Sequence, residues 1–416
     1  MSLPVSHMLA AKKSVRVAAF LACRVQAGVA RVVKADLSPV TVADFAAQAA
    51  VALILVRELH GATAVAKLLR GGGAPSAFRL LGEEDVAALA GRDAASVALL
   101  GHVVAAMSAG LPPRGAFLGH AGVEGSGDGE WSGADVLAAI SACSCKGGLE
   151  SECHESEEKD TTEAGAGEKA KANANEITQA HFPTGYWVLD PIDGTKGFLR
   201  GGQWAVGLAY VARGVPVLAA IAAPNVPLGV WSESGSGSGS GGAGGAGGVG
   251  VLFSAALGEG GWVEDLHVAD GATARPTPLT GGRRASHADL VLCESFEAAH
   301  TDRSMSVAVV TALGSGSVPP IQIDSMVKYG LLARGCGDIY VRLPQRGYKE
   351  KVWDHAPGAL LIKEAGGVIT DARGKVLDFS RGSTLDANEG IIAAMDPVVH
   401  RIALEAAIKA LAARQG

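Results

Sequence analysis

The chain has 416 residues, 48% of them hydrophobic, and a formal net charge of −6, which allows two domains or one large two-lobed unit with a substantial core. No apolar run approaches the roughly 18 residues that cross a bilayer, and no sustained lysine and arginine block suggests nucleic-acid or membrane-surface binding. Six cysteines in a chain this long are not the disulfide framework of a small secreted domain. We therefore expect a soluble intracellular protein that binds neither nucleic acid nor membrane.

The N-terminal residues 1–35 contain basic side chains and no acidic one, as organelle-targeting segments do. The same stretch places Val15, Ala18, Leu21 and Val25 at helical spacing. We favour a helix of the fold, which the sequence Asp36-Leu37-Ser38-Pro39 would end. The compartment stays open between the cytoplasm, a chloroplast and a mitochondrion.

Two segments in the first hundred residues place acidic side chains at the ends of elements. A second helix is predicted to begin at Asp44, which could cap backbone amides or face a cation. An apolar strand over 74–81 runs into Gly82 followed by Glu83, Glu84 and Asp85. Acidic residues in such a loop are usually solvated, so this cluster is a metal site only if other ligands converge on it.

A polar insertion is predicted over residues 119–183, where glycine, serine, glutamate and alanine dominate and one short helix covers 132–142. The insertion contains Cys143, Cys145 and Cys153, whose spacing does not match a zinc finger or ribbon. They are either a redox-sensitive pair or ordinary surface thiols.

The most informative stretch is Trp187-Val188-Leu189-Asp190-Pro191-Ile192-Asp193-Gly194-Thr195-Lys196-Gly197-Phe198. A buried strand is predicted to end at Asp190, because Pro191 cannot continue a central ladder. Two neighbouring carboxylates at the end of a buried strand repel each other, and a divalent cation removes that repulsion. The backbone amides of Gly194 and Thr195, at a predicted helix start, would then face an anion.

The remainder of the chain predicts a β-hairpin over 204–222, a Gly/Ser/Ala loop over 234–248, and strands at 251–254 and 262–263. Strands and helices then alternate, and a helix is predicted over 356–365 just after Asp354. We expect an N-terminal α+β lobe over 1–230, which contains most of the acidic candidates, and a C-terminal α/β lobe over 231–416.

Carboxylates from separate element ends make a convergent metal site the leading hypothesis. The set has five members: Asp44, Glu83, Asp190, Asp193 and Asp354. Ligation by oxygen alone selects Mg²⁺, with Mn²⁺ as the alternative, over zinc or copper. Five acids exceed the needs of one Mg²⁺, so we expect two or three ions, an arrangement that suits phosphate ester hydrolysis.

Several separated motifs resemble the lithium-sensitive, magnesium-dependent phosphomonoesterases, a superfamily that includes inositol monophosphatase and fructose-1,6-bisphosphatase. The superfamily motifs are Asp190 to Thr195, Gly82-Glu83-Glu84 and Trp353-Asp354-His355. Five more resemble the 3′(2′),5′-bisphosphate nucleotidases: Val40 to Phe45, Lys196-Gly197-Phe198, Glu297-Ala298-Ala299-His300, Ile323-Asp324-Ser325 with Lys328-Tyr329, and Tyr348 to Asp354. The resemblance implies a layered αβαβα sugar-phosphatase fold, and it covers nearly the whole chain outside the two low-complexity stretches.

The resemblance also implies a role for each matched residue. Glu83, Asp190, Asp193, Asp354 and the carbonyl of Ile192 would hold the metals. Asp44 and Thr195 would activate the attacking water. The amides of Gly194 and Thr195 would bind the 3′-phosphate, and the nucleotide contacts would come from His300, Ser325, Lys328 and Arg342, with Asp324 and Tyr348 as weaker candidates.

The resemblance implies hydrolysis of the 3′-phosphate of adenosine 3′,5′-bisphosphate. It is also compatible with a second substrate, the analogue that has a 5′-phosphosulfate in place of the 5′-phosphate. The alternatives are an inositol polyphosphate 1-phosphatase and a redox- or ligand-sensing protein on a phosphatase scaffold. We expect a monomer or a weak dimer. One departure from the family pattern stands out, because Met326-Val327 replaces the Gln-Ala that commonly lies between the serine and the lysine.

Overall fold

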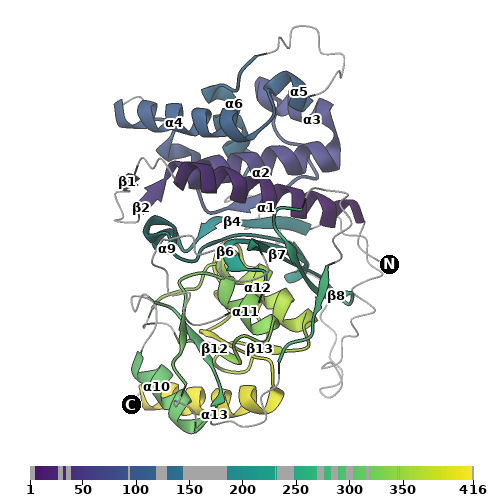
Figure 1. The fold of residues 1–416 in the computed structure, drawn as a ribbon. Helices are drawn as coiled ribbons and strands as arrows, with labels where there is room; N and C mark the ends of the chain where they lie inside the picture. Colours follow the sequence, from purple (N-terminus) through teal and green to yellow (C-terminus); the bar gives the residue numbers. More distant parts are fainter. Residues whose placement is uncertain are drawn as a thin grey trace, which may run out of the picture.

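The computed structural model describes residues 5–26, 31–33, 39–91, 94–118, 129–143, 185–229, 231, 248–268, 276–282, 289–296, 303–314, 318–343, 345 and 347–414. These residues form five layers in the order helices, sheet, helices, sheet, helices (Figure 1). The layered αβαβα arrangement expected from the sequence is confirmed. The predicted insertion at 119–183 and the loop at 234–248 lie largely outside the described residues.

The first layer consists of helices above the larger sheet (Figure 1). Its elements are α1 (Val5–Gln26), α2 (Val42–His60), α3 (Ala62–Lys67), the π-helical turn η1 (Leu68–Gly72), the 3-10 turn η2 (Val86–Ala88), α4 (Ala94–Gly110), α5 (Arg114–Leu118) and α6 (Gly133–Ser141). Ser132 caps α6 in a capping box with Asp135, close to where the sequence predicted that helix.

The N-terminal helix belongs to the fold, as predicted, but it ends at Gln26 and not near residues 36–39. The chain instead forms a short antiparallel hairpin of β1 (Arg31–Val33) and β2 (Pro39–Thr41) before α2 begins. The β-branched residues Val32 and Val33 favour this extended pairing over continuation of the helix. Gly28, two residues after Gln26, is the local sequence signal for the end of α1 that the prediction did not use.

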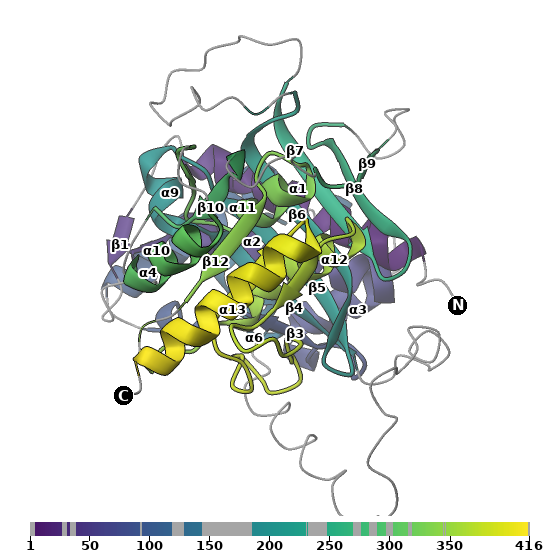
Figure 2. The same ribbon diagram turned by 90° about the horizontal axis from the view of Figure 1, so that it is seen from below.

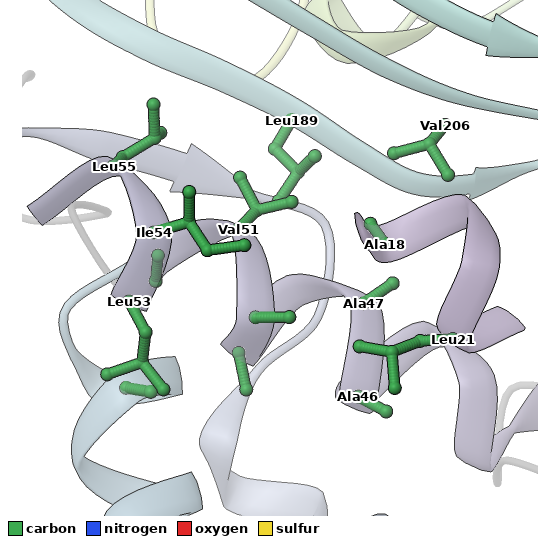
Figure 3. Close-up of a cluster of buried hydrophobic side chains, with 14 of the residues drawn as sticks. Ala18, Leu21, Ala46, Ala47, Val51, Leu53, Ile54, Leu55, Leu189 and Val206 are labelled. Carbon is green, nitrogen blue, oxygen red and sulfur yellow. The ribbon is translucent and has the colours of Figure 1, made fainter. Parts of the chain in front are cut away.

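The core between the helices and the sheet is built on α2, which is buried on every side from Val42 to Val56. Its alanines, including Ala46 and Ala47, let α1 approach closely, while larger side chains reach the sheet at Leu189 and Val206 (Figure 3). A helix that is apolar all round can be stable only when it is enclosed in this way. This enclosure fixes the start of α2, where Asp44 lies.

The larger sheet has seven strands in the order β3-β4-β5-β6-β7-β8-β9. They are β3 (Leu80–Gly82), β4 (Gly185–Asp193), β5 (Ala205–Ala212), β6 (Val215–Pro227), β7 (Val249–Ala256), β8 (Gly260–Asp265) and β9 (Thr277–Leu279). Only the β3–β4 pair is parallel. The strand predicted over 74–81 is shorter than expected. Because β3 and β4 are parallel, their C-terminal ends bring residues 83 and 190 to the same edge.

The second sheet has five strands in the order β11-β10-β12-β14-β13. These are β10 (Leu292–Glu294), β11 (Ile321–Gln322), β12 (Ile339–Arg342), β13 (Val368–Thr370) and β14 (Ile391–Ala394). Helices α11 (Val327–Ala333) and α12 (Val352–Glu364) lie between the two sheets, and α10 (Arg303–Ala312) and α13 (Pro397–Ala413) cover the outer face (Figures 1 and 2). The sequence analysis did not identify β14 or α13. Helix α12 begins at Val352, earlier than predicted, which puts Asp354 in its first turn.

The predicted division at residue 230 falls between β6 and β7, which are adjacent strands of the larger sheet. The chain therefore does not pass from one sheet to the other at residue 230, and the division into two lobes stays a prediction. Among the described helices, none combines the length and the apolar character needed to cross a membrane.

Candidate metal and phosphate site

The central strand β4 does not end at Asp190 but continues to Asp193. Its pairing with β5 shifts register between Asp190 and Asp193, so a bulge accommodates Pro191, whose missing N–H would otherwise interrupt the ladder. Gly194 then adopts a left-handed conformation with φ 87°, and the short helix α9 (Thr195–Arg200) begins. The bulge is the physical reason why the strand outlasts the proline.

The five predicted carboxylates are brought together around Asp190. Burial raises the pKa of Asp190 well above its usual value, and the negative charges of Glu83, Asp193, Asp354 and Asp44 raise it further. These charges come from α2, the end of β3, β4 and the first turn of α12. One carboxylate oxygen of Asp190, Oδ1, is buried without a hydrogen-bond partner. Such an atom requires a cation or a proton.

Asp193 occupies a mixed electrostatic environment. Burial and the charge of Asp354 raise its pKa to about 7, although Lys328, the backbone N–H of Met326 and Arg342 oppose the shift. The Met326 N–H donates a short hydrogen bond to Asp193 Oδ2. Asp193 therefore lies between the acidic cluster and two cationic side chains, Lys328 of α11 and Arg342 of β12.

The donor set fits a hard divalent cation. It consists of carboxylates, it includes an unpartnered buried oxygen, and burial together with the repulsion between carboxylates raises the pKa of both Asp190 and Asp193. This structure thus contains a candidate acidic metal site. Asp44 and Asp190 are buried, whereas Glu83 is exposed, so the cluster extends from the core to the surface.

A second grouping shares one member with this cluster. Ligand atoms of Glu350, Asp354 and His355 lie within 4.8 Å of one another. Glu350 Oε1, however, already accepts from Arg342 Nε at 2.9 Å, and its Oε2 lies 2.8 Å from Arg342 Nη2 and 3.0 Å from His355 Nε2. Because both Glu350 oxygens are engaged, we assign Asp354 alone to the metal cluster.

The backbone of Glu84, next to Glu83, is held by a residue that the sequence did not single out, Gln48. Gln48 on α2 accepts a hydrogen bond from the backbone N–H of Glu84 at 3.0 Å and donates one to its carbonyl at 2.7 Å. A Cβ atom at Gly82 would lie only 2.5 Å from Gln48 Oε1. The clamp therefore needs glycine at position 82. The sequence did contain a signal for this contact, because Gln48 is a polar residue among the alanines of an apolar helix.

The residues after Asp193 lie next to the segment that precedes α11. The Thr195 hydroxyl donates to the carbonyl of Ile192 at 3.2 Å, so two predicted site atoms are in contact. A Cβ at Gly194 would meet the Ser325 Cβ at 3.0 Å, which places the predicted phosphate-binding turn against the predicted nucleotide-binding serine. The metal and substrate roles of Ile192, Gly194 and Ser325 stay predictions.

The predicted nucleotide-binding cations are largely buried. Lys328 donates to the carbonyl of Ile323 at 2.5 Å and lies over the Tyr340 ring, and burial lowers its pKa to about 8 even though Asp193 raises it. Arg342 is held by Glu350, and its Nη2 lies 3.9 Å from Asp354 Oδ2. Both cations thus adjoin the acidic cluster, although their role in binding a nucleotide stays a prediction.

The weaker candidates also have defined partners. Asp324 forms an ion pair with Arg200 of α9 at 2.6 Å, and the Tyr348 hydroxyl accepts from Arg342 at 3.3 Å. Met326 packs its side chain on Gly207, where a Cβ would lie 2.2 Å from the sulfur. Because Asp193 is contacted by the Met326 backbone, the replacement of glutamine by methionine does not remove this hydrogen bond.

Some predictions lie outside the described residues, namely those for His300, Cys145 and Cys153. Cys143 is described and is buried, with its thiol 3.5 Å from the Ala139 carbonyl. It is therefore not the surface thiol that the sequence analysis expected as one alternative.

Comparison with known proteins identifies relatives along most of the chain. The model of the inositol monophosphatase family matches residues 147–415. A protein from Oryza sativa described as a 3′(2′),5′-bisphosphate nucleotidase is 36% identical over 392 residues, which cover 93% of this chain and 90% of the relative. The Arabidopsis thaliana 3′(2′),5′-bisphosphate nucleotidase 1 is 34% identical over 361 residues, 86% of this chain and 83% of the relative.

Among solved structures, the extragenic suppressor protein suhB from Bartonella henselae aligns over 96% of this chain and 97% of its own, with a TM-score of 0.50 and 16% identity. At this identity the likeness concerns the fold alone. It agrees with the layered architecture described above.

Proposed function

Since the chain belongs to the inositol monophosphatase family, we propose that it is a Mg²⁺-dependent, Li⁺-sensitive phosphatase that hydrolyses the 3′-phosphate of adenosine 3′,5′-bisphosphate to give AMP and phosphate. The phosphosulfate analogue of this nucleotide would be a second substrate. Inositol polyphosphate 1-phosphatase activity is the alternative within the same chemistry.

The observation that carries the proposal is the arrangement of charge around Asp193. On one side, Asp190 and Asp354 belong to a cluster of five carboxylates. On the other, Lys328 and Arg342 lie close enough to affect the pKa of Asp193. A substrate with two phosphate groups needs both features: metal ions for the phosphate that reacts, and protein cations for the one that does not.

In the proposed site, Glu83, Asp190, Asp193, Asp354 and the Ile192 carbonyl would hold two or three Mg²⁺ ions, with Mn²⁺ as a substitute. When bound, Mg²⁺ would supply Lewis-acid stabilisation of the phosphate and a lowered pKa for water. Asp44, buried at the start of α2, would accept a proton from the Thr195 hydroxyl, which in turn would orient the attacking water. The amides of Gly194 and Thr195 would hold the reacting phosphate.

The second phosphate would be bound by Lys328 and Arg342, with Ser325 beside Gly194 and His300 contacting the nucleoside. Lys328 contributes as a point charge from a buried position, whereas the planar guanidinium of Arg342 can present two N–H groups to one phosphate. A substrate with a single phosphate would give Lys328 and Arg342 no phosphate to bind.

The proposal is tested by measuring phosphate release from adenosine 3′,5′-bisphosphate and from inositol 1,4-bisphosphate, each with and without Mg²⁺ and with added Li⁺. We expect Mg²⁺-dependent release that favours the nucleotide and that Li⁺ inhibits. Preference for the inositol substrate would establish the alternative. Release from neither substrate would refute both and leave the sensing protein as the remaining reading.

A further inference from the structure

The guanidinium of Arg342 is held by two bonds to a buried carboxylate. Its Nε donates to Glu350 Oε1 at 2.9 Å, and its Nη2 lies 2.8 Å from Glu350 Oε2. Both side chains are largely buried, with exposed fractions of 12% for Arg342 and 3% for Glu350. A bidentate pair of this kind fixes the plane of the guanidinium as well as its position.

Glu350 is also hydrogen-bonded to buried His355, which in turn contacts buried Tyr329. The ring nitrogen Nε2 of His355 lies 3.0 Å from Glu350 Oε2, and the Tyr329 hydroxyl lies 2.7 Å from His355 Nδ1. Because Glu350 is an acceptor, Nε2 is the donating nitrogen, and the Tyr329 hydroxyl is the hydrogen-bond partner of the other ring nitrogen, Nδ1. The three residues thus form one directed chain of hydrogen bonds that ends at Arg342.

The far end of this chain is anchored in the layer between the two sheets. The Tyr329 ring packs edge-on against Tyr340 at 5.3 Å, and a Cβ at Gly358 would lie only 2.0 Å from the same ring. Tyr329 cannot move without repacking α11 and α12. At the other end, Arg342 Nη2 lies 3.9 Å from Asp354 Oδ2, at the border of the acidic cluster.

We propose that Glu350, supported by His355 and Tyr329, is a positioning residue that orients Arg342 and so gives the site its preference for a substrate with a second phosphate. This inference rests on the proposed function. Glu350 uses the Nε and Nη2 edge of the guanidinium, and the remaining edge is thereby directed to one place. Without Glu350 the arginine keeps its charge but loses its fixed orientation.

The experiment compares adenosine 3′,5′-bisphosphate with adenosine 3′-monophosphate, which lacks the 5′-phosphate, in wild-type protein and in Glu350→Gln. We expect the variant to lose about tenfold or more in kcat/KM for the bisphosphate, mainly through KM, because a desolvated charge pair is broken. For the monophosphate we expect a change below about threefold, since the charge pair does not touch that substrate. An equal loss for both substrates would reduce Glu350 to a scaffold residue and overturn the inference.

Two further variants separate positioning from folding. Tyr329→Phe keeps the ring and removes only the hydroxyl, so it should shift the substrate preference in the same direction, and it carries the test if Glu350→Gln does not fold. Asp371→Asn is the matched control, because Asp371, like Glu350, is a buried carboxylate. It accepts backbone hydrogen bonds and is not part of the hydrogen-bonded series that leads to Arg342. It should lower the thermal midpoint and leave the preference unchanged.

The outcomes distinguish this inference from the proposed function. If wild-type protein prefers the bisphosphate and both network variants keep that preference, the positioning role is wrong and the proposed function stands. If wild-type protein does not hydrolyse the bisphosphate, the proposed function fails and this inference fails with it.

Discussion

The backbone N–H of Met326 donates a hydrogen bond to a carboxylate oxygen of Asp193, which precedes it by 133 residues. This bond joins the end of β4 in the larger sheet to the start of α11 beside the smaller one. It makes the geometry of the acidic cluster depend on how the two sheet regions dock.

Asp193→Asn should abolish the phosphatase activity, with a loss of at least about a hundredfold, because asparagine cannot replace a charged metal ligand. The folded protein should tolerate the change, since asparagine is close in shape to the protonated aspartic acid and its amide oxygen can still accept from Met326. The measurement is turnover together with the thermal midpoint in metal-free buffer. Wild-type activity in this variant would refute the metal site.

The stability of the metal-free protein should fall as the pH rises from about 4 to about 7. Asp193 has a pKa of about 7 in the folded protein against 3.8 in the ordinary case, so the folded state binds more protons than the unfolded state in this window. Asp190, whose pKa is also raised, acts in the same direction. Urea unfolding at a series of pH values in a chelator measures the slope.

Mg²⁺ should remove this pH dependence, because bound cations hold the carboxylates in their ionised form and stabilise the folded state. Repeating the unfolding series with saturating Mg²⁺ provides the comparison. A slope that is the same with and without Mg²⁺ would show that the titrating groups are not metal ligands.

Thr195→Val should lower kcat by about a hundredfold or more if the hydroxyl takes part in proton transfer, and Thr195→Ser should retain most of the activity. The valine keeps the shape of the side chain and loses only the bond to the Ile192 carbonyl. Single-turnover rates at saturating substrate are the appropriate measurement. Equal rates for the two variants would exclude the hydroxyl from the reaction.

Gly358→Ala should destabilise the protein by about 1–3 kcal/mol, because the added methyl group overlaps the Tyr329 ring in a closely packed layer. Gly101→Ala is the matched control in another helix interior: it has no atom within 4 Å of the added Cβ, and it should stabilise by about 0.5–1 kcal/mol through helix propensity. Chemical denaturation of both variants measures the two signs. Destabilisation by both would mean that α4 is packed differently.

Local sequence patterns were sufficient for much of the fold. Two β runs joined by Ala212-Arg213-Gly214 predicted the hairpin of β5 and β6, and in the structure Arg213 and Gly214 both have positive φ. The helical spacing of Val15, Ala18 and Leu21 predicted α1. Boundaries were less reliable, because the length of a strand such as β3 depends on its pairing with β4, which is distant in the sequence.

The sequence indicated which carboxylates belong to the site, but not the residues that support them. Carboxylates at the ends of apolar runs indicated Asp44, Glu83 and Asp354, and the expectation that they converge with Asp190 agrees with the charges acting on that residue. The supporting residues could not be predicted. Gln48 stands out as a polar residue in an apolar helix, but its contact with Glu84 and the contact of Glu350 with Arg342 depend on which elements pack side by side.

Residue types along the chain set the chemistry available to this protein: oxygen ligands in excess, no cysteine and histidine set at zinc spacing, and a glycine-threonine turn after a buried strand. These properties follow from residue type and short-range spacing. The tertiary structure alone decided that Asp193 lies between the acidic cluster and the cations Lys328 and Arg342, because only the docking of the two sheets through α11 and α12 brings those residues together. Electrostatic interactions of this kind depend on distance in space and burial, and neither is encoded in local sequence.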